Sequence, residues 1–128
     1  MKLSYVILYV QDIEKSVQFY QKAFGIKHKF THEGGDYAEM ETGDTTLAFC
    51  VHDLAENLIG KNYAKATSDV LLGSQITFEP NDVKKAYQKA IETGAMLVSQ
   101  PEVKPWNFEV AIVKDLDGHI VELAKNLA

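Results

Sequence analysis

The chain has 128 residues, 46% hydrophobic and 24% charged, and this length and composition are typical of one compact globular domain rather than a disordered chain. Its net charge of −5 argues against a nucleic-acid surface, and no apolar stretch approaches the ~20 residues that a membrane span needs. The N-terminus shows no secretory leader pattern, so we expect a cytoplasmic protein without nucleic-acid or membrane partners.

The first half of the chain predicts a β-α-β-β-β unit. Leu3–Val10 alternates in a way typical of a strand, with Tyr5, Ile7 and Tyr9 on one face. A helix is expected to begin after the cap residue Asp12 and to end before Gly25. Glycine-containing turns separate three further strands, expected at 27–32, 37–41 and 45–51.

The second half predicts the same order of elements. Residues 53–73 form a connector with a short helix near 54–59, which either covers the binding groove or serves as a plain linker. A strand at 74–79 follows, and then a helix capped by Asp82 and ended by Gly94. The remaining strands are expected at 95–99, 108–113 and 119–124.

The two halves are similar in sequence as well as in predicted structure. A shift of 70 positions places Ser4, Asp12, Lys15 and Gln18 on Ser74, Asp82, Lys85 and Gln88. Two copies of one unit imply a pseudo-twofold axis, so matching positions should face each other across a shared groove. We therefore predict an α+β fold for a single domain, 1–128, in which modules 1–52 and 74–128 form curved mixed sheets around a cleft.

Strand alternation and the repeat together predict which residues line the groove. In the last strand, Val121 and Leu123 form the helix-side face, which directs Glu122 toward the groove. The shift of 70 pairs Tyr5 with Gln75, and alignment of two turns gives a shift of 73 that pairs Phe49 with Glu122. The predicted ligand-binding residues are Tyr5, Ile7, Phe49, Gln75, Trp106 and Glu122.

Two further residues have alternative interpretations. Trp106, the only tryptophan, is either an aromatic platform for a ligand or an indole that closes the edge of the core. Cys50, the only cysteine, is expected to be a small buried hydrophobic residue, and a redox sensor is the alternative. The four histidines are not spaced as a metal cluster.

Two sequence runs carry a resemblance to a known family. Val-x-Asp-Ile-x-x-Ser-x-x-Phe-Tyr-x-x-x-Phe-Gly at 10–25 and Asp-x-Asp-Gly-His-x-x-Glu-Leu at 115–123 resemble the vicinal oxygen chelate superfamily. This group includes glyoxalase I, bleomycin resistance proteins and extradiol dioxygenases. The resemblance implies paired β-α-β-β-β modules and a homodimer.

The resemblance also implies a metal position, which this chain does not reproduce. Metal-dependent members carry His, Gln or Glu ligands where this chain has Tyr5, Phe49, Gln75 and Glu122. Phenylalanine cannot bind a metal and a neutral tyrosine is a poor ligand, so only Glu122 is a good match. We therefore expect no metal and no cofactor.

The favoured function is a metal-free small-molecule binding protein of the bleomycin-resistance type. It would hold an aromatic or amphipathic organic ligand, and an aromatic groove with an acidic end favours a planar or partly cationic one. The alternative is a lyase or isomerase related to glyoxalase I, with a divalent metal and with catalytic Glu122 as ligand or general base. A dioxygenase is a further, less favoured alternative.

Overall fold

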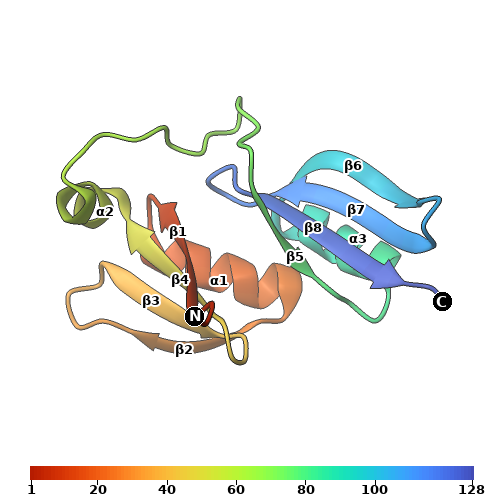
Figure 1. The fold of residues 1–128 in the computed structure, drawn as a ribbon, viewed down its shortest axis with the longest axis horizontal. Coiled ribbons are helices and arrows are strands. Elements are labelled where there is room, and N and C mark those ends of the chain that lie inside the picture. Colours follow the sequence, from red (N-terminus) through yellow and green to blue (C-terminus); the bar gives the residue numbers. More distant parts are fainter. The chain divides into compact units, whose positions relative to one another are not determined.

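The computed structural model describes all 128 residues as eight strands and three helices (Figure 1). In chain order the first half contains β1 (Tyr5–Val10), α1 (Ile13–Phe24), β2 (Lys27–Thr31), β3 (Tyr37–Glu41) and β4 (Thr46–Val51). The connector begins with α2 (His52–Ile59), and the second half contains β5 (Gln75–Phe78), α3 (Val83–Thr93), β6 (Met96–Val103), β7 (Phe108–Lys114) and β8 (Ile120–Asn126). The predicted order of elements and the short connector helix are confirmed.

The strands form two four-stranded mixed sheets with the same topology. Their strand orders are β1-β4-β3-β2 and β5-β8-β7-β6. In each sheet the first strand runs parallel to the last, and the other neighbours are antiparallel. This arrangement confirms the α+β class and the duplicated module. None of the helices is long and apolar enough to cross a membrane.

The chain divides into two compact units. The first consists of Met1–Gln21 with Gly25–Lys65, and the second consists of Lys22–Phe24 with Ala66–Ala128. The connector is therefore divided, because α2 belongs to the first unit and the residues from Ala66 onward belong to the second. The last residues of α1 also belong to the second unit.

The ends of α1 and α3 are set by the predicted capping residues. The Asp12 carboxylate accepts a hydrogen bond from the Lys15 backbone N–H at 2.9 Å, and Asp82 accepts one from Lys85 at 3.0 Å. Gly25 then ends α1 with φ 67°, a left-handed conformation that side chains disfavour. The cap prediction is confirmed for both helices.

The core of each unit lies between its helix and one face of its sheet. In the first unit, the ring of Tyr20 on α1 packs against Phe49 on β4, with centroids 4.9 Å apart. In the second unit, Val83 on α3 packs with Ala111 and Leu123. The rings of Phe24 and Phe78 pack at the edge of this second core, 5.3 Å apart.

The turn before β8 is held by a buried carboxylate. Oδ1 of Asp115 accepts hydrogen bonds from the backbone N–H groups of Asp117, Gly118 and His119 at 2.9 to 3.0 Å. Gly118 has φ 104°, and a Cβ at this position would collide with the backbone of Thr67. Residues Asp115–His119 of the second sequence run therefore form a tight turn. The missing side chain of Gly118 also leaves space for the backbone of Thr67.

Lys114 fixes that crossing segment to the second unit. Its side chain is 5% exposed, and its ammonium group donates to the carbonyl oxygens of Thr67, Ser68 and Val70 at 2.7 to 3.2 Å. Three carbonyl acceptors satisfy all three donors of a lysine ammonium group. This part of the connector is therefore an ordered element of the second unit.

Candidate functional site

The first sheet has one face that α1 does not cover. Register and alternation place these side chains on it: Tyr5, Ile7 and Tyr9 of β1, Thr46, Ala48 and Cys50 of β4, Tyr37, Glu39 and Glu41 of β3, and Lys27 and Phe30 of β2. We call this surface the first open face. Tyr5 and Ile7 are 51% and 43% exposed on it, so the structure places both where strand alternation predicts.

Phe49 does not lie on the first open face, and the prediction for this residue is wrong. It is 0% exposed and packs against Tyr20 of α1. The parallel register pairs Phe49 with Leu8, whereas Ile7 pairs with Ala48. Because side chains alternate between faces, an error of one residue in register moves a side chain to the opposite side of the sheet.

The correct shift between the last strands of the two modules is therefore 74 rather than 73. In the second sheet Glu122 pairs with Thr77, which the shift of 70 relates to Ile7. Since Ile7 pairs with Ala48, the counterpart of Glu122 is Ala48. The first module thus has only a methyl group at this position.

A row of side chains crosses the middle of the first open face. Ile7 lies beside Ala48, Ala48 beside Glu39, and Glu39 beside Phe30, each on a neighbouring strand. In the next row, Tyr37 lies beside Cys50, and the Tyr37 ring packs against Phe30 with centroids 6.4 Å apart. The middle of this face is therefore aromatic and aliphatic, with one carboxylate.

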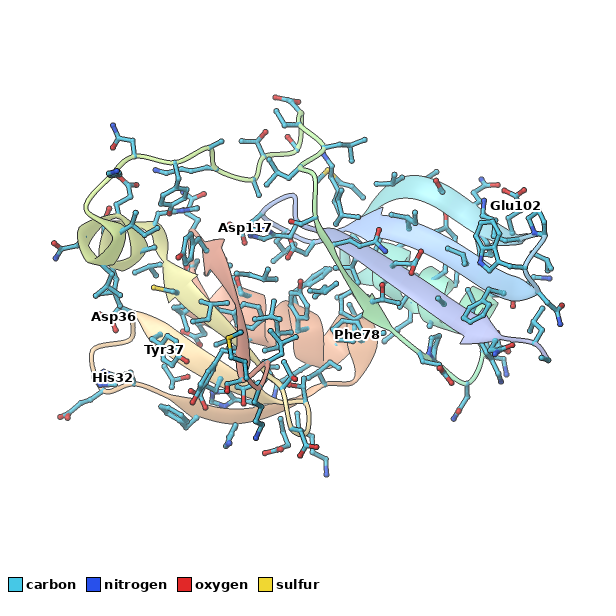
Figure 2. The ribbon with its side chains drawn as sticks, viewed as in Figure 1. His32, Asp36, Tyr37, Phe78, Glu102 and Asp117 are labelled. Carbon is cyan, nitrogen blue, oxygen red and sulfur yellow. The ribbon has the colours of Figure 1, made fainter.

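That carboxylate is almost completely buried. Glu39 is 8% exposed, and its Oε2 accepts a hydrogen bond from the Tyr37 hydroxyl at 2.8 Å. Figure 2 labels Tyr37 on the first sheet. Burial and the adjacent Glu39 raise the pKa of Tyr37, which therefore remains a protonated donor at neutral pH. Sequence reasoning did not select Glu39, although Ala38 and Met40 in the same strand are apolar and indicate that Glu39 points the other way.

Residues after α2 complete one end of the first open face. The ring of Tyr63 packs against Tyr9 of β1, with centroids 5.1 Å apart. The Tyr63 hydroxyl also forms a hydrogen bond with Nδ1 of His52, the first residue of α2. Burial raises the pKa of Tyr63, and the nearby Glu56 carboxylate adds to this effect. Part of the connector therefore packs on β1.

Cys50 is buried on the same face, as predicted. Burial raises the pKa of its thiol, and the Asp36 carboxylate raises it further. A reactive cysteine requires an accessible thiolate and a lowered pKa. The surroundings of Cys50 therefore favour the structural role over the redox sensor.

The second sheet carries a chain of polar side chains on the face opposite its core. Nε2 of Gln75 donates to Oγ1 of Thr77 at 3.2 Å, and the Thr77 hydroxyl donates to Oε1 of Glu122 at 3.0 Å. Leu123 lies in the core, so Glu122 points away from α3 as predicted. Gln75 and Glu122 are thus brought together through Thr77.

Trp106 is separate from this polar chain. Its side chain is 65% exposed at the turn between β6 and β7, which contradicts the alternative that it closes the core edge. Phe108, two residues later, pairs with Asn126, which is about 13 Å along β8 from Glu122 at ~3.3 Å per residue. The second sheet therefore does not place Trp106 beside Glu122.

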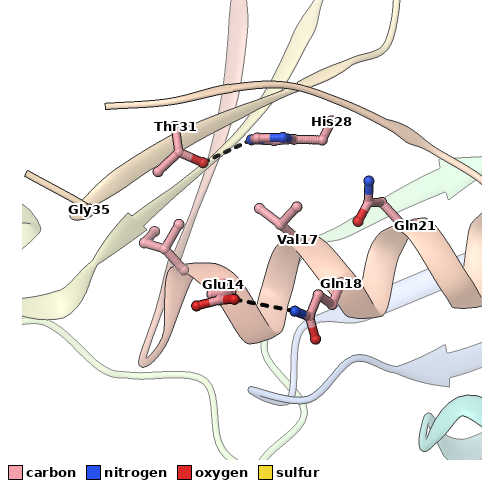
Figure 3. Close-up of a pocket in the computed structure, with 8 residues that line it drawn as sticks. Glu14, Val17, Gln18, Gln21, His28, Thr31 and Gly35 are labelled. Carbon is pink, nitrogen blue, oxygen red and sulfur yellow. Dashed lines mark hydrogen bonds between the residues drawn. The ribbon is translucent and has the colours of Figure 1, made fainter. Parts of the chain in front are cut away.

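A groove of mixed polar and apolar lining lies on the opposite side of the first unit, between α1 and β2 (Figure 3). Its volume is about 420 Å³, and its lining includes Glu14, Gln18 and Gln21 of the helix. On the strand side, His28 forms a hydrogen bond with Thr31 at 2.8 Å. No sequence pattern pointed to this groove, and its polar groups are exposed and partly bonded to one another.

The residues at the family's metal positions do not fit a metal. The corrected alignment places Tyr5, Ala48, Gln75 and Glu122 at these positions. A methyl group donates nothing, a neutral phenol is a poor ligand, and an amide with one carboxylate does not make the three or four N, O or S donors of a transition-metal site. No group of three or more His, Cys, Asp or Glu side chains in the structure is arranged to hold a metal ion.

Comparison with known proteins agrees with the duplicated fold. The sequence model of the glyoxalase-like domain matches residues 3–128. The chain belongs to the glyoxalase-like domain family. This result and the structural neighbours below also establish its membership of the vicinal oxygen chelate superfamily.

Individual proteins are similar to this one over nearly the whole chain. The uncharacterized protein YraH of Bacillus subtilis is 27% identical over 99% of this chain and 100% of its own length. The hypothetical protein SA1046 of S. aureus is 28% identical, with a TM-score of 0.80 over 97% of this chain and 92% of its own. A glyoxalase-related enzyme from Fulvimarina pelagi shares the fold, with a TM-score of 0.86, 19% identity, and coverage of 98% and 88%.

Proposed function

We propose that this protein binds a small organic molecule on the first open face without the help of a metal. The observation that carries the proposal is the exposure of Tyr5, Ile7 and Phe30, three large apolar side chains on a sheet face that α1 does not cover. Exposed apolar surfaces of this kind are typical of binding sites, and burial of a ligand against them supplies free energy by contact alone.

The second sheet, considered by itself, carries a separate proposed ligand-contacting group. Gln75 and Glu122 are proposed as ligand contacts because Thr77 connects them into one hydrogen-bonded chain. Oriented polar groups of this kind are typical of sites that select one ligand among similar molecules. Phe49 is not part of the proposed site, since its ring belongs to the core.

The absence of a suitable donor set is the reason for proposing a metal-independent activity. The proposal predicts that protein purified without chelator contains no stoichiometric transition metal and that EDTA leaves ligand affinity unchanged. Near-stoichiometric nickel, zinc, manganese or iron, measured by mass spectrometry, would instead favour the lyase or isomerase related to glyoxalase I. We also propose, by resemblance to the superfamily, that the protein is a cytoplasmic homodimer. Light scattering tests the dimer by measuring the molar mass in solution.

A matched pair of variants tests the binding surface. A thermal-shift screen over aromatic metabolites should first give a ligand that raises the melting temperature. Ile7→Ser should weaken that ligand, because it removes an exposed apolar contact from the first open face. Ile59→Ser removes an isoleucine of almost the same exposure, 44% against 43%, from α2 and should leave the affinity unchanged. Equal effects of the two variants would refute the proposed location.

A further inference from the structure

The carboxylate of Glu39 has no cationic partner in the folded chain. It is 8% exposed, and its hydrogen bond comes from the neutral Tyr37 hydroxyl. Lys65 forms a salt bridge with Glu56 and Lys104 forms one with Glu102, and neither involves Glu39. A buried carboxylate with one neutral hydrogen-bond donor has lost most of its hydration without gaining a charge partner.

The surroundings of Glu39 are suited to an organic cation. Phe30 lies beside it on β2 and Ile7 lies two strands away in the same row. The Tyr37 ring packs against Phe30 and presents its hydroxyl to Glu39. Aromatic rings attract cations over their faces, and a carboxylate attracts them directly. Lys27 is on this face as well, but it lies opposite Glu41 in the neighbouring row and forms no salt bridge.

We infer that the first open face selects amines that carry an aromatic body, with Glu39 as the charge partner of the ammonium group. Oε2 accepts from Tyr37, which leaves Oε1 to accept a hydrogen bond from the ligand. Phe30 and Tyr37 then contact the aromatic part. The inference rests on the proposed function, because it names the class of ligand for the same surface.

The test compares two probes of nearly the same shape, 2-phenylethylamine and 2-phenylethanol. Each is titrated into isotope-labelled protein at pH 7 and followed by the shifts of backbone amide signals. We expect the amine to bind the unaltered protein about tenfold more tightly than the alcohol, the effect of one charged hydrogen bond. The amide signals of Phe30, Glu39 and Ala48 should move with both probes.

Two isosteric variants separate a direct contact from a general effect of charge. Glu39→Gln should abolish the preference for the amine and leave the alcohol affinity unchanged. Glu41→Gln removes the same charge from an exposed residue of the same face and strand and should retain the preference. A preference that survives Glu39→Gln, or that Glu41→Gln abolishes to the same extent, would overturn the inference.

If Glu39→Gln does not fold, titration of the unaltered protein with both probes still tests the inference. If both probes bind the first open face with equal affinity, the inference on charge is wrong while the proposed function stands. If neither probe moves any amide signal of this face, whereas other aromatic molecules bind the protein elsewhere, the proposed function is wrong as well.

Discussion

Replacement of Phe49 by alanine tests the corrected register of β4 directly. The side chain is 0% exposed and its ring packs against Tyr20, so the substitution leaves a cavity between α1 and the first sheet. Removal of a buried phenylalanine ring costs about 3–5 kcal/mol, and a lost aromatic pair accounts for about 0.5–1.5 kcal/mol of such effects. Typical domains are stable by about 5–15 kcal/mol, so the loss should be large.

The assay is urea unfolding followed by circular dichroism, with two comparison variants. Leu123→Ala removes a side chain from the second core that is 1% exposed, and should cost about 2–5 kcal/mol. Tyr5→Ala removes a half-exposed ring from the first open face and should cost less than either core substitution. The expected order of destabilisation is therefore Phe49→Ala close to Leu123→Ala, with both well above Tyr5→Ala.

The opposite order would refute the reasoning. If Phe49 lined the ligand surface, Phe49→Ala would cost about as little as Tyr5→Ala and would weaken binding of aromatic molecules in the folded protein. The alignment with a shift of 73 would be correct if Phe49→Ala lowered the free energy of unfolding by less than about 1 kcal/mol, as ordinary surface substitutions do, and also lowered ligand affinity.

Three further predictions concern buried polar groups and a tight turn. Lys114→Met should destabilise the second unit by about 2–3 kcal/mol because three carbonyl groups lose a charged donor, and faster hydrogen exchange at residues 67–70 should accompany the loss. Gly118→Ala should lower the free energy of unfolding by more than the ~1–3 kcal/mol of backbone strain, because the added Cβ collides with the backbone of Thr67. An unchanged midpoint of urea unfolding would contradict this. The pKa of Tyr37 is raised above 10.0, so its stabilising effect is complete below pH 10 and is lost as the pH rises above that value. Stability measured from pH 8 to 11 should therefore fall more steeply in the unaltered protein than in Tyr37→Phe, and parallel curves would contradict the assignment.

The sequence predicted the elements of the fold because their signals are local. Asp12 and Asp82 are followed by amphipathic helices that end at glycine, and each signal acts within a few residues. The face of β8 was also predictable, because Val121 and Leu123 alternate with the polar Glu122. The face of β4 was not, since every residue of Leu47–Val51 is apolar and such a run does not show which side faces the core.

The register error arose from an assumption about turn length. The shift of 73 came from aligning the turns before β4 and β8, at Asp44 and Asp117, and assumed that both strands begin at the same distance from these residues. In the turn before β8, the Asp115 carboxylate instead accepts hydrogen bonds from the backbone N–H groups of Gly118 and His119. As a result, Glu122 corresponds to Ala48, at a shift of 74. The packing of Tyr63 on Tyr9 could not be predicted either, because it joins the connector to a strand far away in the sequence.

The corrected alignment shows that the two modules differ by exchanging the positions of an acidic and an apolar residue. In the first sheet Glu39 on β3 is beside Ala48 on β4, whereas in the second sheet Ile112 on β7 is beside Glu122 on β8. The two carboxylates therefore lie on non-equivalent strands and have different hydrogen-bond donors, since Tyr37 donates to Glu39 and Thr77 donates to Glu122. A transition metal needs three or four N, O or S donors, and this exchange leaves a methyl group in place of one of them, while a buried acidic group lies among aromatic side chains of the first sheet. The same substitutions that make the metal position incomplete thus supply the charge on which selection of an amine depends.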